Sequence, residues 1–345
     1  HGANFGSAPA AAAVMGEVGR INDTLTHAPK TIALTHSYNN PIVFAWPVSR
    51  DGGDKSVIRI TDIQADNFTL YVDEAPNHGS GAHTTEAVSY LVLEAGKWTL
   101  PDGSILEAGV ISTTATVGQN VANQWHTVYF DELFAANPIV LSQVQTNHDP
   151  NWVKTRQQNV IANSFQLAME EEEAKSSSHG TEIVGWLAIE PGTGSWGSHL
   201  YEAAQTPNEV TNSWYSIPFG QSFSSAPRFL ATLATYDDPD NAHLRYSRTS
   251  LTAAGVQIIV EEDKTADSET THSAEAVSYL ALENSGVLTG FVATRNLQQT
   301  VIQYQYDSLY RLTKADYSGG VQASYTYVYD AVGNMTTFTE TVGIT

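Results

Sequence analysis

The sequence HTTEAVSYL at residues 83–91 decides the fold, because it returns as HGTEIVGWL at residues 179–187 and as HSAEAVSYL at residues 272–280. A second segment returns with nearly the same spacing, as PIVFA at residues 41–45, PIVLS at residues 138–142 and PRFLA at residues 227–231. Two independent segments that share a period of roughly 95 residues indicate three tandem copies of one domain.

The repeated blocks have the composition of β-strands. A third block lies between the other two, as FTLYV at residues 68–72, FQLAM at residues 165–169 and VQIIV at residues 256–260. All the blocks are short, rich in Val, Ile, Phe, Tyr and Leu, and bounded by Gly, Asp, Asn or Pro, which is typical of strands. About six such strands in each copy predict an antiparallel β-sandwich, so we expect an all-β chain.

The repeats and the flanking sequence divide the chain into five parts. We predict an N-terminal segment at residues 1–16, sandwich repeats at residues 17–109, 110–203 and 204–290, and a β-hairpin tract at residues 291–345.

Composition narrows the possible partners. The 345 residues include 16 Lys and Arg against 37 Asp and Glu, a net charge of -21, which repels phosphate backbones and anionic lipid headgroups. No apolar run reaches the length of about 18 residues that a membrane-spanning helix needs. The absence of cysteine excludes disulfides, thiol nucleophiles and cysteine-bound zinc. We therefore expect no nucleic-acid partner and no membrane insertion, and the acidity favours a secreted protein.

The order of blocks in each repeat resembles the H-type lectin domain. The shared pattern is a Pro-led strand, an Asp-rich loop, an Arg-bearing strand, a Phe-type strand and the HxxE block that leads into VSYLALE, over roughly residues 17–290. The resemblance implies a six-stranded sandwich that assembles as trimers and binds galactose-type glycans. Three fused copies with short connections would then form an internal pseudo-trimer and bind glycans multivalently.

The last part of the chain resembles a different family. YQYD at residues 304–307 and YTYVYDAVGN at residues 325–334 are similar to the YD (Rhs-type) repeats of large bacterial surface proteins, although Tyr310 stands where that family has Gly. The resemblance implies a secreted or cell-surface protein of a bacterium. Because two copies are too few to bury a core, we expect the tract to dock on its own chain or on a neighbour.

The Asp-rich loops are the candidate ligand sites. They begin about ten residues after each conserved Pro, and an Arg follows on the next strand; in the H-type lectins an acid of this loop holds the sugar. Carboxylates accept sugar hydroxyls and guanidinium groups donate to them. The candidates are Asp51, Asp54, Arg59, Asp149, Arg156, Asp237, Asp238 and Arg245. The alternative is that Asp, Gly and Pro stand there only to form a turn.

A second set of polar residues recurs in every repeat, namely a Glu that ends one strand and the His and Glu of HxxE. Carboxylates and imidazole together could bind a divalent ion, with calcium possible although no cofactor is required. The candidates are Glu74, His83, Glu86, Glu171, His179, Glu182, Glu262, His272 and Glu275. A structural hydrogen-bond network is the alternative that we favour, because strand side chains alternate and chelation would need the His to lie in a loop.

These patterns favour binding over catalysis. A catalytic site is expected once, whereas the polar positions recur three times, and no nucleophile elbow or HExxH motif occurs. Trp98 and Trp196 are candidates for stacking on a sugar ring. The leading hypothesis is an extracellular, non-enzymatic lectin-like protein, and the alternative is a subunit of a self-associating fibre or stalk whose hairpin tract adds to a neighbouring sheet.

Overall fold

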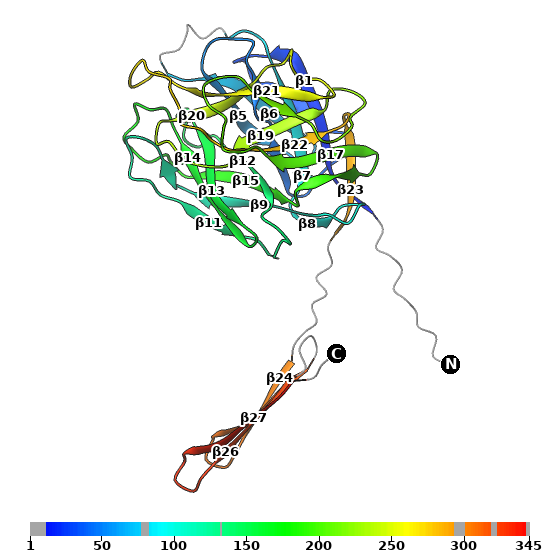
Figure 1. Ribbon diagram of the computed structural model, residues 1–345, viewed down its shortest axis with the longest axis vertical. Coiled ribbons are helices and arrows are strands. Elements are labelled where there is room, and N and C mark those ends of the chain that lie inside the picture. The colour runs from blue at the N-terminus through cyan, green and yellow to red at the C-terminus, as the bar shows by residue number, and fades with distance from the viewer. Residues whose placement is uncertain (1–11, 77–82, 132, 293–300, 319–322, 343–345) are drawn as a thin grey trace, which may run out of the picture. The chain divides into compact units, whose positions relative to one another are not determined.

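The computed structural model describes residues 12–76, 83–131, 133–292, 301–318 and 323–342. These residues form strands and turns without any α-helix, which confirms the prediction of an all-β chain (Figure 1). The chain divides into two compact units, residues 1–293 and residues 294–345. Each unit is described by itself.

The first repeat is a six-stranded sandwich. One sheet is formed by β1 (Ala13–Leu25), β7 (Glu86–Glu94) and β3 (Pro41–Phe44), with β7 in the middle. The other is formed by β2 (Lys30–Ala33), β6 (Asn67–Glu74) and β5 (Ser56–Ile63), with β6 in the middle. Alternate residues of β6 are buried, so the period of two in FTLYV reflects one face on the core.

The second and third repeats have the same plan. Their first sheets consist of β9 (Ile105–Thr113), β15 (Glu182–Ile189) and β12 (Ile139–Val144), and of β17 (His199–Gln205), β22 (Val277–Leu282) and β19 (Arg228–Leu233). Their second sheets consist of β11 (His126–Tyr129), β14 (Ser164–Glu170) and β13 (Lys154–Ile161), and of β18 (Tyr215–Pro218), β21 (Gly255–Glu262) and β20 (Ala242–Tyr246). Two-residue strands, β4 (Val48–Ser49) and β10 (Thr116–Val117), complete the first unit.

A short extra strand joins each repeat to the next. β8 (Gly96–Thr99) pairs with β9, β16 (Gly192–Trp196) pairs with β17, and β23 (Gly286–Val292) pairs with β1, the first strand of the chain. The last strand of the third repeat thus pairs with the first strand of the first repeat, just as β8 pairs with β9 and β16 with β17. The three repeats form a closed ring.

Glycine begins each of these joining strands. Gly96, Gly192 and Gly286 have φ values of 133°, 145° and 156°, a region that other residues rarely adopt. At Gly286 a β-carbon would lie 2.9 Å from the His199 ring, so space as well as conformation requires glycine there.

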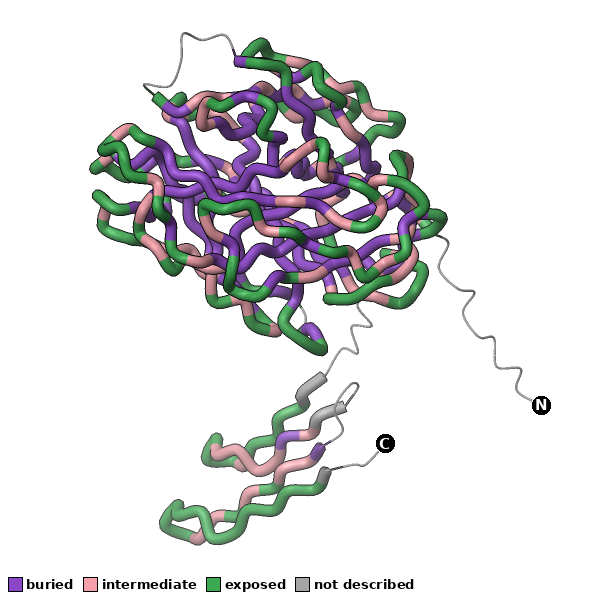
Figure 2. Tube along the Cα trace, turned by 45° about the horizontal axis from the view of Figure 1, so that its top comes forward, coloured by how far each residue is buried: buried purple, intermediate pink, exposed green. Residues whose placement is uncertain are grey.

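The three sandwiches share a central core. Leu91, Leu187 and Leu280, which occupy one position of the HxxE block, are fully buried in a single hydrophobic cluster together with Trp98 and Trp196. Figure 2 shows this buried interior of the first unit. The two tryptophans are only 4% and 0% exposed, so the expectation that they stack on a sugar was wrong. Trp98 in β8 and Trp196 in β16 instead pack into the core that the three repeats share.

The second unit is a four-stranded antiparallel sheet. β24 (Val301–Tyr306), β25 (Leu312–Ser318), β26 (Ala323–Tyr329) and β27 (Met335–Val342) pair in chain order. Among its described side chains only Ala315 and Ala323 are buried, whereas Tyr304, Tyr306 and Phe338 are at least half exposed (Figure 2). The sheet has ordered pairing but no hydrophobic interior.

Candidate functional site

The glutamates of the three HxxE motifs lie where adjacent repeats meet. Glu86, Glu182 and Glu275 are fully buried at or just before the start of β7, β15 and β22. Each motif His lies in the preceding loop and bridges two carboxylates: His83 Nδ1 is 2.6 Å from Glu74 Oε1, and its Nε2 is 3.0 Å from Glu86 Oε1. His179 and His272 make the equivalent pairs of contacts. The motif therefore joins a strand end to a strand start within each repeat.

A hydroxyl residue holds each of these glutamates from the other side. Ser49, Thr146 and Thr235 donate to Glu86, Glu182 and Glu275, respectively. The same hydroxyl oxygens accept a hydrogen bond from the amide after the glutamate, at 2.8 to 2.9 Å. Sequence reasoning missed these residues, although each lies eight positions after the conserved Pro of its repeat. That constant spacing is the signal that could have found them.

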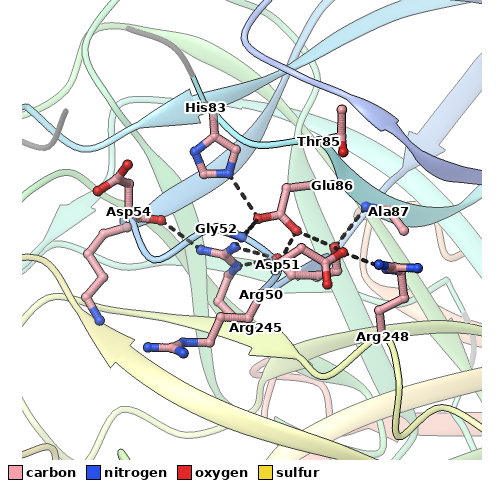
Figure 3. Close-up of polar contacts among 12 residues, drawn as sticks. Arg50, Asp51, Gly52, Asp54, His83, Thr85, Glu86, Ala87, Arg245 and Arg248 are labelled. Atoms are coloured by element: carbon pink, nitrogen blue, oxygen red, sulfur yellow. Dashed lines mark hydrogen bonds and ion pairs between the residues drawn. The ribbon is translucent and has the colours of Figure 1, made fainter. Parts of the chain in front are cut away.

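The conserved arginines run from each repeat into the next. Arg245 of the third repeat donates to Glu86 of the first at 2.8 Å, and Figure 3 shows it reaching the loop that holds this glutamate. Arg156 of the second repeat donates to Glu275 of the third at 2.6 Å. Arg59 of the first repeat lies 3.6 Å from Glu182 of the second and donates to the carbonyl of Asp149 at 3.0 Å. The ring of repeats therefore contains a ring of ion pairs.

This geometry corrects the sugar-donor role expected for Arg59, Arg156 and Arg245. Their side chains are at most 1% exposed, and they donate hydrogen bonds to groups of a neighbouring repeat or of the same repeat. A guanidinium that is enclosed between two domains has no surface to offer to a glycan. The three arginines instead fix how the repeats are arranged.

The electrostatics fit ionised pairs. Burial alone would raise the pKa of Glu182, but the contacts from His179, Thr146 and two loop amides outweigh it and lower the pKa to about 2. Burial lowers the pKa of His179, yet its hydrogen bonds to Glu171 and Glu182 outweigh that effect and raise the pKa. Both shifts favour a cationic imidazole between two ionised carboxylates.

The Asp-rich loops contain both turn-forming and outward-facing acids. Asp149 accepts backbone hydrogen bonds from Gly180 at 2.8 Å and Asn151 at 3.1 Å, and Asp238 likewise accepts from Ser273 and Asp240. These two carboxylates therefore serve the turn itself. Asp237 is exposed and accepts from Asn208 at 2.8 Å.

The first loop has a different environment. Asp51 is at the surface, where Arg248 of the third repeat donates to its Oδ2 at 2.6 Å (Figure 3). The neighbouring Arg50 lies 5.9 Å from the ring of Trp214, which is 42% exposed. Arg50 also donates to Glu261 of the third repeat at 2.6 Å, so the first and third repeats meet here through several polar contacts, two of them at the surface. The sequence gives no signal for Arg248 or Trp214. Trp125 has the same repeat position as Trp214 but packs on Tyr236, and nothing in the sequence distinguishes the packed tryptophan from the exposed one.

The structure also brings together most of the candidate metal ligands. In each repeat a Glu and a His join an Asp of the loop, with one potential ligand atom from each residue all within 4.8 Å of one another. The sets are Asp54, Glu74 and His83; Asp149, Glu171 and His179; and Asp238, Glu262 and His272. Glu86, Glu182 and Glu275 lie outside these sets, on the other side of each His, and an acid of the loop takes their place.

Comparison with known proteins yields one clear similarity. The chain is 33% identical over 271 residues to a protein named halomucin from Haloquadratum walsbyi, and the match covers 76% of this chain but 3% of halomucin. That organism is an archaeon, so the comparison gives no support to the expected bacterial origin. No protein-family model and no solved structure matches the chain. Within the described residues no helix has the length and apolar character needed to cross a membrane.

Proposed function

We propose that this chain is a non-catalytic, extracellular glycan-recognition module that presents its binding surface where adjacent repeats meet. The observation that favours this most is two contacts between the first and third repeats, one joining Asp51 to Arg248 and the other bringing Arg50 to 5.9 Å from the exposed Trp214 ring. Sugar sites combine a few oriented polar groups with an aromatic face, and all of these are present here.

A binding role suits the repeated architecture better than catalysis does. The polar residues that recur in all three copies are occupied in holding the repeats together, as the buried Arg156 and Glu275 illustrate. The exposed residues around the loops vary between copies, so each junction offers a different surface. A protein that presents several shallow sites on one ring binds a multivalent glycan surface more tightly than any single site would.

An extracellular location is supported by the acidity of the chain and by its similarity to a segment of a protein with a mucin name. Because the chain spans 3% of that protein, the similarity concerns one segment of it, and we infer the ligand from this chain's own surface.

The test is a glycan array probed with the intact chain, with and without calcium. We expect binding to galactose-type glycans that is lost in the double variant Asp51→Asn, Trp214→Ala. The control is Tyr129→Ala, which removes an aromatic residue that is 72% exposed on the second repeat, away from this junction. Equal binding by the double variant and the wild type, or the absence of any bound glycan, would contradict the proposal.

A second candidate function is a subunit of a self-associating fibre or stalk. Its support is the sheet of residues 301–342, in which β24 and β27 each pair on one side only and aromatic side chains are exposed. Unpaired strand edges can accept a strand from another chain. Electron microscopy and size-exclusion chromatography test this: polymers of the full chain that disappear when residues 294–345 are deleted favour a fibre, whereas a monodisperse full chain rejects it.

A further inference from the structure

The third repeat differs from the other two in the acids of its loop. Counted from the hydroxyl residues Ser49, Thr146 and Thr235, the third following position holds Gly52, Asp149 and Asp238, and the fifth holds Asp54, Asn151 and Asp240. Only the third repeat has a carboxylate at both positions.

These acids meet two glutamates. Single oxygens of Asp240, Glu262 and Glu269 all lie within 4.8 Å of one another, and Glu262 also belongs to the set formed with Asp238 and His272. Glu262 ends β21, and Glu269 lies in the following loop, which leads to His272. Three carboxylates thus form one group at the end of a strand, and Glu262 also contacts a second set that contains Asp238.

The central carboxylate is buried with one oxygen unused. Glu262 is 0% exposed; its Oε1 is 2.8 Å from His272 Nδ1, while its Oε2 has no hydrogen-bond partner. Burying a charged oxygen without a partner is costly, because it loses water and gains nothing in return. An ion or a ligand donor at this oxygen would remove the cost.

The other two carboxylates are also only partly engaged. Asp240 Oδ1 accepts a hydrogen bond from the Gln119 side chain, and Glu269 Oε1 accepts one from the Thr271 amide at 3.0 Å. Among the described residues, no Lys or Arg forms an ion pair with Asp240, Glu262 or Glu269, and the cationic partner of Glu262, His272, is shared with Glu275. The cluster therefore has more negative charge than its protein partners balance.

The mutual repulsion of these groups is visible in their ionisation. Burial raises the pKa of Glu262, and the contact with Glu269 adds to the rise. Burial together with the charges of Asp238 and Glu269 raises the pKa of Asp240. Both directions are those expected of carboxylates whose negative charge exceeds that of the nearby cation His272.

We propose that the third repeat binds a calcium ion through carboxylate oxygens of Asp240, Glu262 and Glu269. Oxygen ligands select a hard cation, and a site that combines loop residues with one strand residue suits the flexible coordination of calcium better than the strict octahedron of magnesium. Glu269 is exposed, so the ion can enter from solvent and keep water in its remaining positions. This inference stands independently of glycan binding.

Affinity is expected to be weak. A site made of two loop carboxylates and one strand carboxylate, open to solvent at Glu269, belongs to the class of extracellular modules, with a Kd of about 10⁻⁴ to 10⁻³ M. Isothermal titration calorimetry of the intact chain with calcium chloride, in buffer freed of divalent ions, should show one site in this range.

Two variants identify the ligands. The double variant Asp240→Asn, Glu269→Gln changes two side chains that are not buried, and we expect it to weaken calcium binding at least tenfold while the circular dichroism spectrum without calcium stays unchanged. Asp54→Asn is the matched control, because Asp54 occupies in the first repeat the position that Asp240 occupies in the third. Asp54 groups with Glu74 and His83, away from the proposed site. This variant should leave the Kd for calcium within twofold of the wild-type value.

Four outcomes would overturn the inference. They are no binding of calcium at about 10 mM, well above the expected Kd; unchanged affinity in the Asp240→Asn, Glu269→Gln variant; an equal loss of affinity in Asp54→Asn; and magnesium binding as tight as calcium binding. An absence of calcium binding would indicate that Glu262 and Glu269 share a proton and bind no cation.

Discussion

Buried charge at the junctions is the feature that most affects this protein at the scale of single residues. Arg59, Arg156 and Arg245 each place a guanidinium between two repeats, where water cannot compensate for a lost partner. Such pairs give little net stability compared with apolar packing, but removing one partner leaves a naked charge inside the protein. Each guanidinium finds its carboxylate on the neighbouring repeat, so we expect these pairs to favour this arrangement of the repeats over others.

The substitution Arg156→Met should therefore destabilise the first unit strongly. It would remove the guanidinium that Glu170 and Glu275 share and leave them only Lys154 and His272 as cationic neighbours, so we expect a loss of about 3 kcal/mol in the free energy of unfolding. Chemical denaturation followed by tryptophan fluorescence measures this.

The control for that substitution is Arg248→Met, which removes a guanidinium that is 34% exposed and paired with Asp51 at the surface. A surface pair contributes about 1 kcal/mol or less. Equal losses of unfolding free energy in the two variants would show that the buried charge of Arg156 contributes no more than a charge at the surface.

Glu182 makes stability depend on pH on the acid side. Its pKa is lowered from 4.5 to about 2 in the folded chain, so its contribution is present above pH 4.5 and is lost as the pH falls towards 2. The thermal midpoint of the wild type should exceed that of Glu182→Gln at pH 6, and the gap should narrow steadily below pH 4.5. The exposed Glu209→Gln variant should show no such narrowing; a constant gap for Glu182→Gln would refute the pairing.

The polar sites could be predicted only in part at this scale. Repetition alone identified the His and Glu of each HxxE block and their partners at the strand ends. It gave Arg156 the wrong role, because its partner Glu275 is 119 residues away and belongs to another repeat. A periodic sequence reveals which residues are equivalent, but the contacts between copies depend on how the copies are arranged.

At the scale of elements, the strands of each sandwich follow directly from short apolar blocks bounded by turn residues. The joining strands β8, β16 and β23 were not predicted, and their sequences explain why. GTGSW in β16 has no alternation of apolar residues, and β23 pairs with a strand more than 260 residues away in sequence. Their pairing depends on partners, which a local pattern does not contain.

The hairpins of the second unit allow a test of local strain. Asp307 and Asp330 hold equivalent turns by accepting amides two and four residues later, and the residue three positions on has a positive φ in both: 61° at Tyr310 and 99° at Gly333. A residue with a β-carbon is disfavoured there by roughly 1–2 kcal/mol.

Tyr310→Gly should therefore stabilise the β24–β25 hairpin. We expect amide hydrogen exchange in β24 and β25 to slow by about fivefold or more, since 1 kcal/mol corresponds to that factor. Leu309→Gly, in the same turn but without a positive φ, should speed exchange, because it only adds freedom to the unfolded chain. Faster exchange in Tyr310→Gly would show that the tyrosine ring contributes more than its backbone costs.

At the scale of the whole molecule, pairing of β1 with β23 closes the ring of repeats. The other two junctions between repeats have the same kind of strand pair, and there the two strands are also connected by the chain. Ala13 pairs with Gly290, so the residues at which the chain enters and leaves the ring lie next to each other. The seam between the third and first repeats lacks only a peptide connection.

A circular permutant should therefore fold. Residue 292 would be joined to residue 12 by a short loop, and new ends would be opened at residues 101–103, between β8 and β9. We expect cooperative thermal unfolding within a few degrees of that of residues 12–292, because closing a short loop costs little. A chain that ends at residue 285 is the control, and it should unfold at a clearly lower temperature; failure of the permutant to fold would mean that the seams are not equivalent.

The same closure determines how the ring would respond to mechanical load. The start of β1 and the end of β23 lie at one end of a single antiparallel ladder. Tension between residues 12 and 292 would load this ladder one residue pair at a time, because both strands would be pulled from the same end of it. The pair of strands that completes the ring is thus also the place where force would open it first.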